Sequence, residues 1–359
     1  MYICSYMTSY TAARGRGAGS NPANRFERLH YEPDPSHPGE SAGDHRTRFY
    51  KDSASTVITR NDSPDIPFRY SLNPYRGCEH GCIYCYARPT HEYLGFSAGI
   101  EFETRIMVKE DAPALLRAEL SAGSWKADPI VFSGVTDPYQ PVERRLGLTR
   151  RCLEVLAEFR QPVALITKNA GPARDLDLLR ALARWNACSV SVSLTTLDAT
   201  LARTMEPRTA SPRQRLHLIR TMAQAGIPVG VMTAPVIPGL NDTEIPAILE
   251  AAGAAGAQWA GYTLVRLPLA VAPLFTDWLE RYYPTRKDRI LDGIRKARAG
   301  KLNNADFGAR MRGAGSGAEQ VRQLFQLGLR RSGIPQEHPP LSNRHFRRPG
   351  PQQLDLDLE

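Results

Sequence analysis

The sequence has 359 residues with a formal net charge of +9, and 42% of its residues are hydrophobic. A chain of this length is long enough to bury at least one sizeable core. No run approaches the roughly 18 uncharged apolar residues that a membrane span needs, and the first ten residues lack the basic start and apolar centre of a signal peptide. We therefore expect a soluble, cytoplasmic protein with no membrane partner. Six cysteines are too few for a disulfide scaffold, so a close cluster of them is more typical of metal binding or catalysis.

The two ends of the chain differ in composition from its middle. Residues 1–65 are rich in Gly, Pro, Ser, Asn and Arg without apolar periodicity, and residues 334–359 contain repeated prolines. Both segments are predicted to be flexible extensions. Between them lie the predicted core, residues 66–268, and a predicted helical segment, residues 269–333.

Short β-branched runs alternate with helical patterns through the core. The strand candidates are 71–76, 130–135, 162–167, 189–194, 229–233 and 259–264, and the helical patterns cover 111–120, 149–159, 174–183, 212–225 and 243–255. Ser211 with Gln214 and Asn241 with Glu244 match capping boxes at helix starts. This alternation predicts parallel βα units. An eight-unit barrel takes about 250 residues, so six units need roughly 190, and the spacing fits a six-unit partial barrel as well as an open six-stranded sheet.

The fourth predicted strand has one polar face. Ser189, Ser191 and Ser193 alternate with apolar residues, although both faces of a parallel strand are normally covered. A polar inner face predicts a lined cavity inside the barrel. An edge strand with one solvated face is the alternative interpretation.

Three cysteines, Cys78, Cys82 and Cys85, lie within eight residues on the loop expected after the first strand. A structural zinc site takes four ligands, usually in two pairs, and the sequence has no second cysteine pair. His80 is a fourth donor only if a tight loop turns it inward. Three thiolates suit a four-iron cluster with one iron open to a small chelating molecule. Loops at the carboxyl ends of barrel strands are where such a molecule binds.

The wider motif, NPYRGCEHGCIYCYAR over residues 73–88, resembles the radical S-adenosylmethionine (SAM) superfamily, and in particular its spore photolyase-related branch. The resemblance implies an α/β fold, a partial (βα)6 TIM-type barrel with a C-terminal helical extension. It also implies a [4Fe-4S] cluster on Cys78, Cys82 and Cys85, with SAM on the fourth iron. In this superfamily an electron from the cluster cleaves SAM, and the resulting 5′-deoxyadenosyl radical abstracts hydrogen from a substrate. An electron donor such as flavodoxin or ferredoxin is implied as a partner.

The same resemblance assigns cofactor contacts. Tyr84 matches the aromatic residue that packs near the adenine. Thr136 and Asp137, after the second strand, match the position that holds the methionine amino group, where an ammonium donor needs acceptors. Lys168 and Ser193, at the ends of the third and fourth strands, match polar positions that contact the cofactor.

Arg208, just beyond the fourth strand, is a further candidate for contact with the SAM carboxylate, and Tyr86 is the candidate radical relay. Gly134 stands where spore photolyase carries a hydrogen-donating cysteine, which places repair of a spore-type thymine lesion in doubt. Cys152 and Cys188 are expected to be buried small hydrophobes.

The positive charge is concentrated in residues 281–331, which hold thirteen Lys or Arg against four acidic residues. A phosphate backbone selects such a concentration, although solvated helix faces share it. We expect this segment to cover the open side of the barrel and to bind an anionic substrate, with DNA or RNA as the leading candidates. Two alternatives remain: a non-enzymatic, zinc-stapled nucleic-acid-binding module, and a radical SAM enzyme that modifies a protein substrate.

Overall fold

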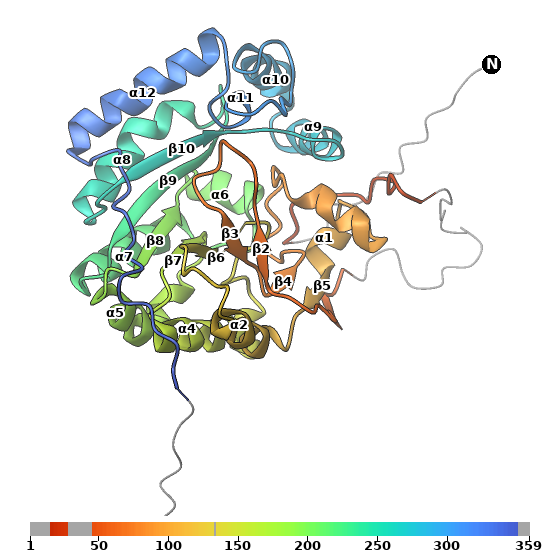
Figure 1. The fold of residues 1–359 in the computed structure, drawn as a ribbon. Coiled ribbons are helices and arrows are strands. Elements are labelled where there is room, and N and C mark those ends of the chain that lie inside the picture. The colour runs from red at the N-terminus through yellow and green to blue at the C-terminus, as the bar shows by residue number, and fades with distance from the viewer. Residues whose placement is uncertain (1–14, 28–44, 133, 351–359) are drawn as a thin grey trace, which may run out of the picture.

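The computed structural model describes residues 15–27, 45–132 and 134–350. Its centre is a curved seven-stranded sheet in the order β10-β9-β8-β7-β6-β3-β2 (Figure 1). The strands are β2 (Ile58–Arg60), β3 (Tyr70–Leu72), β6 (Ile130–Phe132), β7 (Val163–Thr167), β8 (Cys188–Ser193), β9 (Val229–Val236) and β10 (Ala260–Leu264). The six strands from β3 to β10 run parallel, and β2 is antiparallel to β3. In the described part of the chain β10 and β2 are the two edges of the sheet, so it is an open arc of six βα units.

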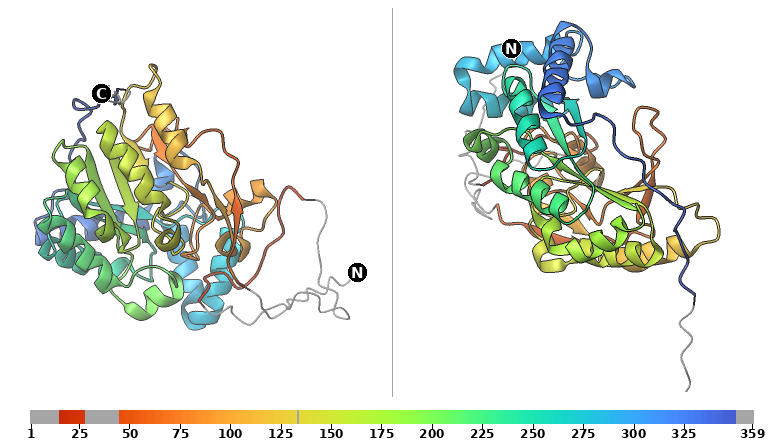
Figure 2. Two further views of the ribbon diagram at one scale, coloured as in Figure 1. Left: turned by 90° about the horizontal axis from the view of Figure 1, so that it is seen from below. Right: turned by 90° about the vertical axis from the view of Figure 1, so that its left-hand side faces the viewer.

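Helices cover the outside of this arc, as the two side views in Figure 2 show. The longer ones are α2 (Ala112–Ser121), α4 (Leu148–Phe159), α5 (Leu176–Ala183), α7 (Pro212–Gln224) and α8 (Ile245–Ala254). Short helices lie in the connecting loops: η1 (Arg88–Leu94), α1 (Glu101–Thr104), α3 (Glu143–Leu146), η2 (Gly171–Asp175), α6 (Ala199–Met205) and η3 (Asp242–Glu244). The predicted alternation of parallel strands and helices is confirmed.

The two faces of the sheet differ in exposure. The thiol of Cys188 contacts the carbonyl oxygen of Leu179 in α5 at 3.2 Å, which places the apolar side of β8 against the helices. The serines of β8 therefore point to the inside of the arc, and β8 pairs on both sides, so the edge-strand interpretation is wrong. The inner face is only partly buried on the neighbouring strands, at Ala164, Ile166, Met232, Ala234, Gly261 and Thr263. The inner face of β7, β9 and β10 thus keeps some exposure to solvent.

The amino ends of the strands are covered by the C-terminal stretch, residues 335–350, which runs down one side of the molecule (Figure 2). The imidazole of His338 lies 2.8 Å from the hydroxyl of Ser189 and packs against Trp259 with ring centroids 4.5 Å apart. Further along, the N–H of Ser342 donates to the carbonyl of Asn186 at 2.8 Å. This stretch therefore closes the bottom of the arc.

A second, three-stranded sheet was not predicted. It contains β1 (Arg48–Lys51), β5 (Arg105–Val108) and β4 (Tyr75–Arg76), in the order β1-β5-β4. β1 comes from the segment expected to be an extension, and Ala18 from the same segment is buried beside Ile83. Described parts of both terminal segments thus lie against the core, and the domain limits stay a prediction.

The helical segment after β10 lies beside the last strand. It contains α9 (Val271–Tyr282), η4 (Pro284–Arg286), α10 (Lys287–Lys296), α11 (Ala309–Arg312) and α12 (Ser316–Ser332), and α12 packs along α8 (Figure 1). The loop between β2 and β3 reaches this segment, where Asp65 accepts hydrogen bonds from Arg310 Nε at 2.7 Å and from the N–H of Gly308 at 3.0 Å. This contact bridges the open side of the arc. None of the described helices is long and apolar enough to cross a lipid bilayer.

One predicted helix cap is correct and one is wrong. Ser211 and Gln214 form a capping box at the start of α7. The amide of Asn241 instead donates to a carbonyl just after β8 at 2.8 Å, and the carboxylate of Glu244 binds the turn at residues 196–197. Both side chains tie loops together, so neither caps α8.

Candidate active site

The three clustered cysteines lie on the loop that leaves β3 at the carboxyl edge of the sheet. Their thiols are free, Cys78 and Cys82 are buried, and Cys85 is half-buried. Gly77 and Gly81 have φ of 77° and 66°, a left-handed conformation that residues with a Cβ rarely adopt. The glycines on either side of Cys78 therefore shape the loop that carries the thiols.

A buried ion pair holds this loop from behind. Arg88 donates to the carbonyl of Cys82 at 3.0 Å and pairs with Glu103. Glu103 also accepts the N–H groups of Gly17 and its neighbour, at 3.1 and 2.9 Å. A Cβ on Gly17 would lie 1.7 Å from the carbonyl oxygen of Gly81. The N-terminal segment thus forms a close-fitting wall behind the cysteine loop.

The three thiols have the chemistry that an iron–sulfur cluster requires. Burial raises the pKa of Cys78, Cys82 and Cys85, so a metal must displace their protons. Among the described residues no three His, Cys, Asp or Glu side chains converge on one single-ion site. A four-iron cluster does not need that convergence, because each thiolate binds a different iron. Three free thiols on one short loop therefore fit such a cluster.

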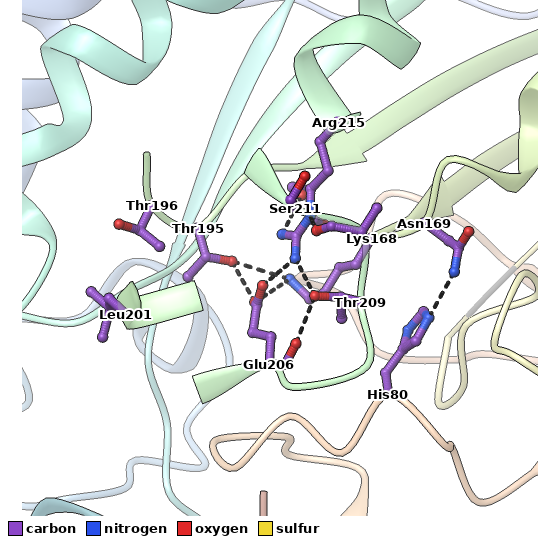
Figure 3. A network of polar contacts seen from close by, with 12 residues as sticks. His80, Lys168, Asn169, Thr195, Thr196, Leu201, Glu206, Thr209, Ser211 and Arg215 are labelled. Atoms are coloured by element: carbon purple, nitrogen blue, oxygen red, sulfur yellow. Dashed lines mark hydrogen bonds and ion pairs between the residues drawn. The ribbon is translucent and has the colours of Figure 1, made fainter. Parts of the chain in front are cut away.

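The His80 side chain contacts polar side chains of two neighbouring loops. Its Nδ1 lies 3.4 Å from the carboxylate of Asp137, and its Nε2 lies 3.2 Å from the side-chain nitrogen of Asn169 (Figure 3). Both ring nitrogens of His80 therefore contact side chains on the loops that follow β6 and β7. A fourth zinc ligand is therefore not supplied by His80.

Asp137 and Thr136 lie on the loop after β6, and both are buried. The Asp137 carboxylate accepts hydrogen bonds from the Thr167 hydroxyl at 2.8 Å and from the N–H of Lys168 at 2.7 Å. Burial raises the pKa of Asp137, but the charge of His80 and these donors outweigh it and hold the pKa below its ordinary value. Asp137 is thus an ionised anchor between two strand ends.

A buried polar network surrounds Glu206, at the carboxyl ends of β7 and β8 (Figure 3). Its carboxylate pairs with Arg215 and accepts the hydroxyls of Tyr84 and Thr195, the latter at 2.6 Å. Lys168 Nζ lies 3.4 Å from the same carboxylate, 2.8 Å from a β9 carbonyl and 5.5 Å from the Tyr84 ring centroid. Burial raises the pKa of Glu206, but the Arg215 and Lys168 charges lower it well below its ordinary value. The network fixes the tyrosine and the lysine together.

Tyr86 lies at the open side of the arc and is 45% exposed. Its hydroxyl donates to the carbonyl of Gly134, and the Arg266 guanidinium lies 4.3 Å from its ring centroid. Arg266 follows β10, at the opposite edge of the sheet from β3. A Cβ on Gly134 would lie 3.4 Å from the side-chain nitrogen of Asn73, an ordinary contact, so this position has room for a side chain.

The structure brings together most, but not all, of the residues that the sequence singled out. Tyr84 and Lys168 share the Glu206 network, and the carbonyl of Ser193 joins it by accepting Arg215 Nη1 at 2.9 Å. Arg208 lies apart, with its guanidinium 3.1 Å from the carboxylate of Glu79. Sequence reasoning missed Glu206, Thr195 and Arg215. The one available signal was the acidic residue two positions before Arg208.

The comparisons with known proteins identify the class. The profile of the radical SAM superfamily matches residues 72–252, about half of the chain, so the chain belongs to this superfamily. An uncharacterized protein of Mycobacterium tuberculosis is 40% identical over 235 residues, which span 64% of this chain and 68% of that protein. The radical SAM Nalpha-GlyT isomerase of Pseudomonas phage M6 is 26% identical over 256 residues, 70% of this chain and 51% of that protein.

Among solved structures, spore photoproduct lyase complexed with dinucleoside spore photoproduct has the same fold, with a TM-score of 0.55 and 16% identity over 78% of each chain. The protein is therefore an enzyme, and its superfamily uses a [4Fe-4S] cluster and SAM. The interpretation as a non-enzymatic zinc module is wrong.

Proposed function

We propose that this radical SAM enzyme acts on a nucleic acid, with its cluster on Cys78, Cys82 and Cys85. The observation that carries the substrate class is a group of aromatic and arginine side chains at the open side of the arc, next to the cysteine loop. It includes Tyr86 with Arg266, and Phe307 with Arg310 4.8 Å from its ring centroid.

The cofactor would lie against the carboxyl ends of the strands. When bound, the cluster and SAM supply a 5′-deoxyadenosyl radical. Thr136 is the proposed acceptor for the methionine amino group, and Asp137 adds negative charge beside it while it holds the loop. Lys168 keeps 18% of its side chain exposed, which leaves its ammonium accessible to a carboxylate or a ribose hydroxyl. Ser193 would face the same ligand from the inner side of β8.

Tyr84 is the proposed neighbour of the adenine. Its hydroxyl donates a hydrogen bond to Glu206, and the Lys168 ammonium lies 5.5 Å from its ring centroid, so the ring has a fixed orientation. A fixed aromatic face supports a purine without a loss of side-chain entropy on binding. Glu206 is proposed as a positioning residue for both side chains.

Tyr86 is the proposed relay to the substrate. Gly134 offers no thiol, and the exposed phenol that is bonded to its carbonyl is the nearby side chain with a transferable hydrogen atom. The phenol would lose that atom as the substrate radical gains it. The Arg266 guanidinium over the ring would hold the phenol at the opening.

The basic segment contributes less free charge than its composition suggests. Arg298 is buried and donates to the carbonyls of residues 264 and 265. Lys287, Arg295 and Arg322 each pair with an acidic residue. At the mouth of the arc Arg310 is likewise paired with Asp65, so Arg266 is the proposed cationic contact for a substrate there.

The aromatic and arginine pairs at that mouth suit a nucleic acid. Phe307 is 60% exposed, and an exposed ring stacks on a base with about 1–3 kcal/mol per base. Arg266, which lies over the Tyr86 ring, is the proposed contact for phosphate. The dinucleoside in the spore photoproduct lyase complex supports the same substrate class.

The test is anaerobic reconstitution followed by SAM cleavage in the presence of candidate substrates. We expect about four irons and four sulfides per chain, as a [4Fe-4S] cluster requires, and 5′-deoxyadenosine formation under dithionite. The triple Cys78→Ala/Cys82→Ala/Cys85→Ala variant should lose both. Single-stranded DNA, duplex DNA and RNA are compared across a salt series, with deuterated substrate to follow hydrogen transfer.

Retention of nucleic acid should weaken with salt, because phosphate contacts release counterions. It should also weaken in Phe307→Ala, while iron content stays unchanged. Absent or salt-independent retention, or stimulation by peptides alone, would contradict the nucleic-acid substrate.

A further inference from the structure

A hollow of about 460 Å³ lies beside the cysteine loop, between β1, the N-terminal segment and the loops that follow β6 and α6. Four arginines line it: Arg16, Arg46, Arg145 and Arg208. Among its described lining residues Glu79 is the acidic one, and its carboxylate already accepts the N–H of Val142 at 2.7 Å and Arg208 at 3.1 Å. The described lining of the hollow therefore carries more arginines than carboxylates.

The arginines are held close to one another. The pKa of Arg16 is lowered, first by burial and then by the positive charge of Arg208. The Arg145 guanidinium rests 4.8 Å from the ring centroid of Phe49 in β1, and Arg46 and Arg145 are exposed at the rim. The positive charges of Arg16 and Arg208 repel one another, so a bound anionic surface would stabilise them.

The hollow approaches the cysteine loop from outside the arc. Glu79 directly follows Cys78, and its N–H donates to the side chain of Gln140 at 2.9 Å. β1 belongs to the small sheet, outside the ring of parallel strands, whereas Lys168 and Ser193 belong to the strand ends of the arc. The hollow is thus one residue from a proposed cluster ligand without occupying the substrate side.

Resting on the proposed cluster at Cys78, Cys82 and Cys85, we propose that this basic hollow is the docking surface for an acidic one-electron carrier protein of the flavodoxin or ferredoxin class. One electron passes from the carrier to the cluster. The carrier is oxidised by one electron, the cluster is reduced by one electron, and no bond is made or broken in the transfer. A separate docking surface lets the electron arrive while a substrate covers the mouth.

The competing occupant is the phosphate backbone of the substrate. The position of the hollow argues against it, because the reacting atoms of a substrate must lie on the inner side of the arc. Charge complementarity alone fits both occupants, so the experiment separates them.

The experiment uses the reconstituted full chain and three variants. Arg46→Glu/Arg145→Glu reverses the rim charge, and Arg46→Lys/Arg145→Lys keeps it. Arg213→Glu/Arg220→Glu on the exposed face of α7 is the matched control for a reversal of two surface charges. Binding of a flavodoxin and of a ferredoxin is measured by surface plasmon resonance across a salt series. Cluster reduction is followed by the loss of visible absorbance, with each carrier and with dithionite.

We expect the charge reversal to weaken carrier binding by about tenfold or more at low salt and to slow reduction by the carrier in parallel. The lysine variant and Arg213→Glu/Arg220→Glu should behave like the parent, and all four proteins should be reduced by dithionite at one rate. Unchanged affinity for both carriers in the charge-reversed variant would overturn the proposal, as would a loss of nucleic-acid binding in its place. If the parent protein holds no cluster that dithionite can reduce, the proposed function itself is wrong, and the docking proposal that rests on it is wrong as well.

Discussion

Replacing Glu206 by glutamine should strongly lower the free energy of unfolding, although the new side chain has nearly the same size and shape. The side chain of Glu206 is fully buried, and that of its partner Arg215 is 1% exposed. Removing one member of a buried pair leaves an uncompensated charge, which costs about 3–5 kcal/mol. Arg215 also donates to the carbonyls of Ala210 and Ser193 at 2.8 and 2.9 Å. Those bonds persist in the variant, so we expect a value near the lower end, about 3 kcal/mol.

The assay is urea unfolding of the cluster-free protein, followed by tryptophan fluorescence. The double variant Glu206→Gln/Arg215→Gln removes both charges and should recover part of the loss, which a double-mutant cycle quantifies. Glu158→Gln breaks the exposed pair with Arg117 and should cost less than about 1 kcal/mol. A loss of unfolding free energy below about 1 kcal/mol for Glu206→Gln would refute the reasoning. So would a double variant whose loss equals or exceeds the sum of the losses of the two single variants.

Two further predictions concern stability away from the network. Burial lowers the pKa of His91 to about 4, below the unfolded value of about 6.5, so the unfolded chain binds the proton first as pH falls. The free energy of unfolding should therefore drop by up to about 3 kcal/mol between pH 6.5 and 4. The His91→Phe variant should lose that part of the pH dependence. Unfolding midpoints that change with pH in parallel for the variant and the parent would contradict this. A Cβ on Gly230 would lie 2.2 Å from the Trp259 ring, so Gly230→Ala should cost about 1–3 kcal/mol. Gly134→Ala meets ordinary contacts and should leave the melting temperature nearly unchanged, and equal melting temperatures for the two variants would show the packing argument to be wrong.

The parallel strands were predictable because each is a short apolar run followed by a helix. The small sheet was not predictable, because β1 pairs with a strand more than fifty residues away and β4 is only two residues long. Neither strand has a hydrophobic alternation of its own. Their pairing depends on the tertiary structure.

The cysteine loop was predictable because its chemistry is local in sequence. The Glu206 network was not, since a buried carboxylate depends on donors from several loops and no periodicity marks it. Asn241 and Glu244 illustrate the same limit. Their spacing matches a capping box, yet both side chains form hydrogen bonds with the backbone just after β8. Arg208 was predicted to contact the SAM carboxylate, whereas in the structure its guanidinium pairs with the carboxylate of Glu79.

The contact of His338 with Ser189 has a kinetic consequence. In the described part of the chain, residues 335–350 cover the amino ends of the strands near Ser189 and Trp259, so we expect the cofactor and the substrate to enter from the carboxyl ends. On the proposed function, a nucleic acid seated at that end would trap what had entered before it, so SAM should bind first and 5′-deoxyadenosine should leave last.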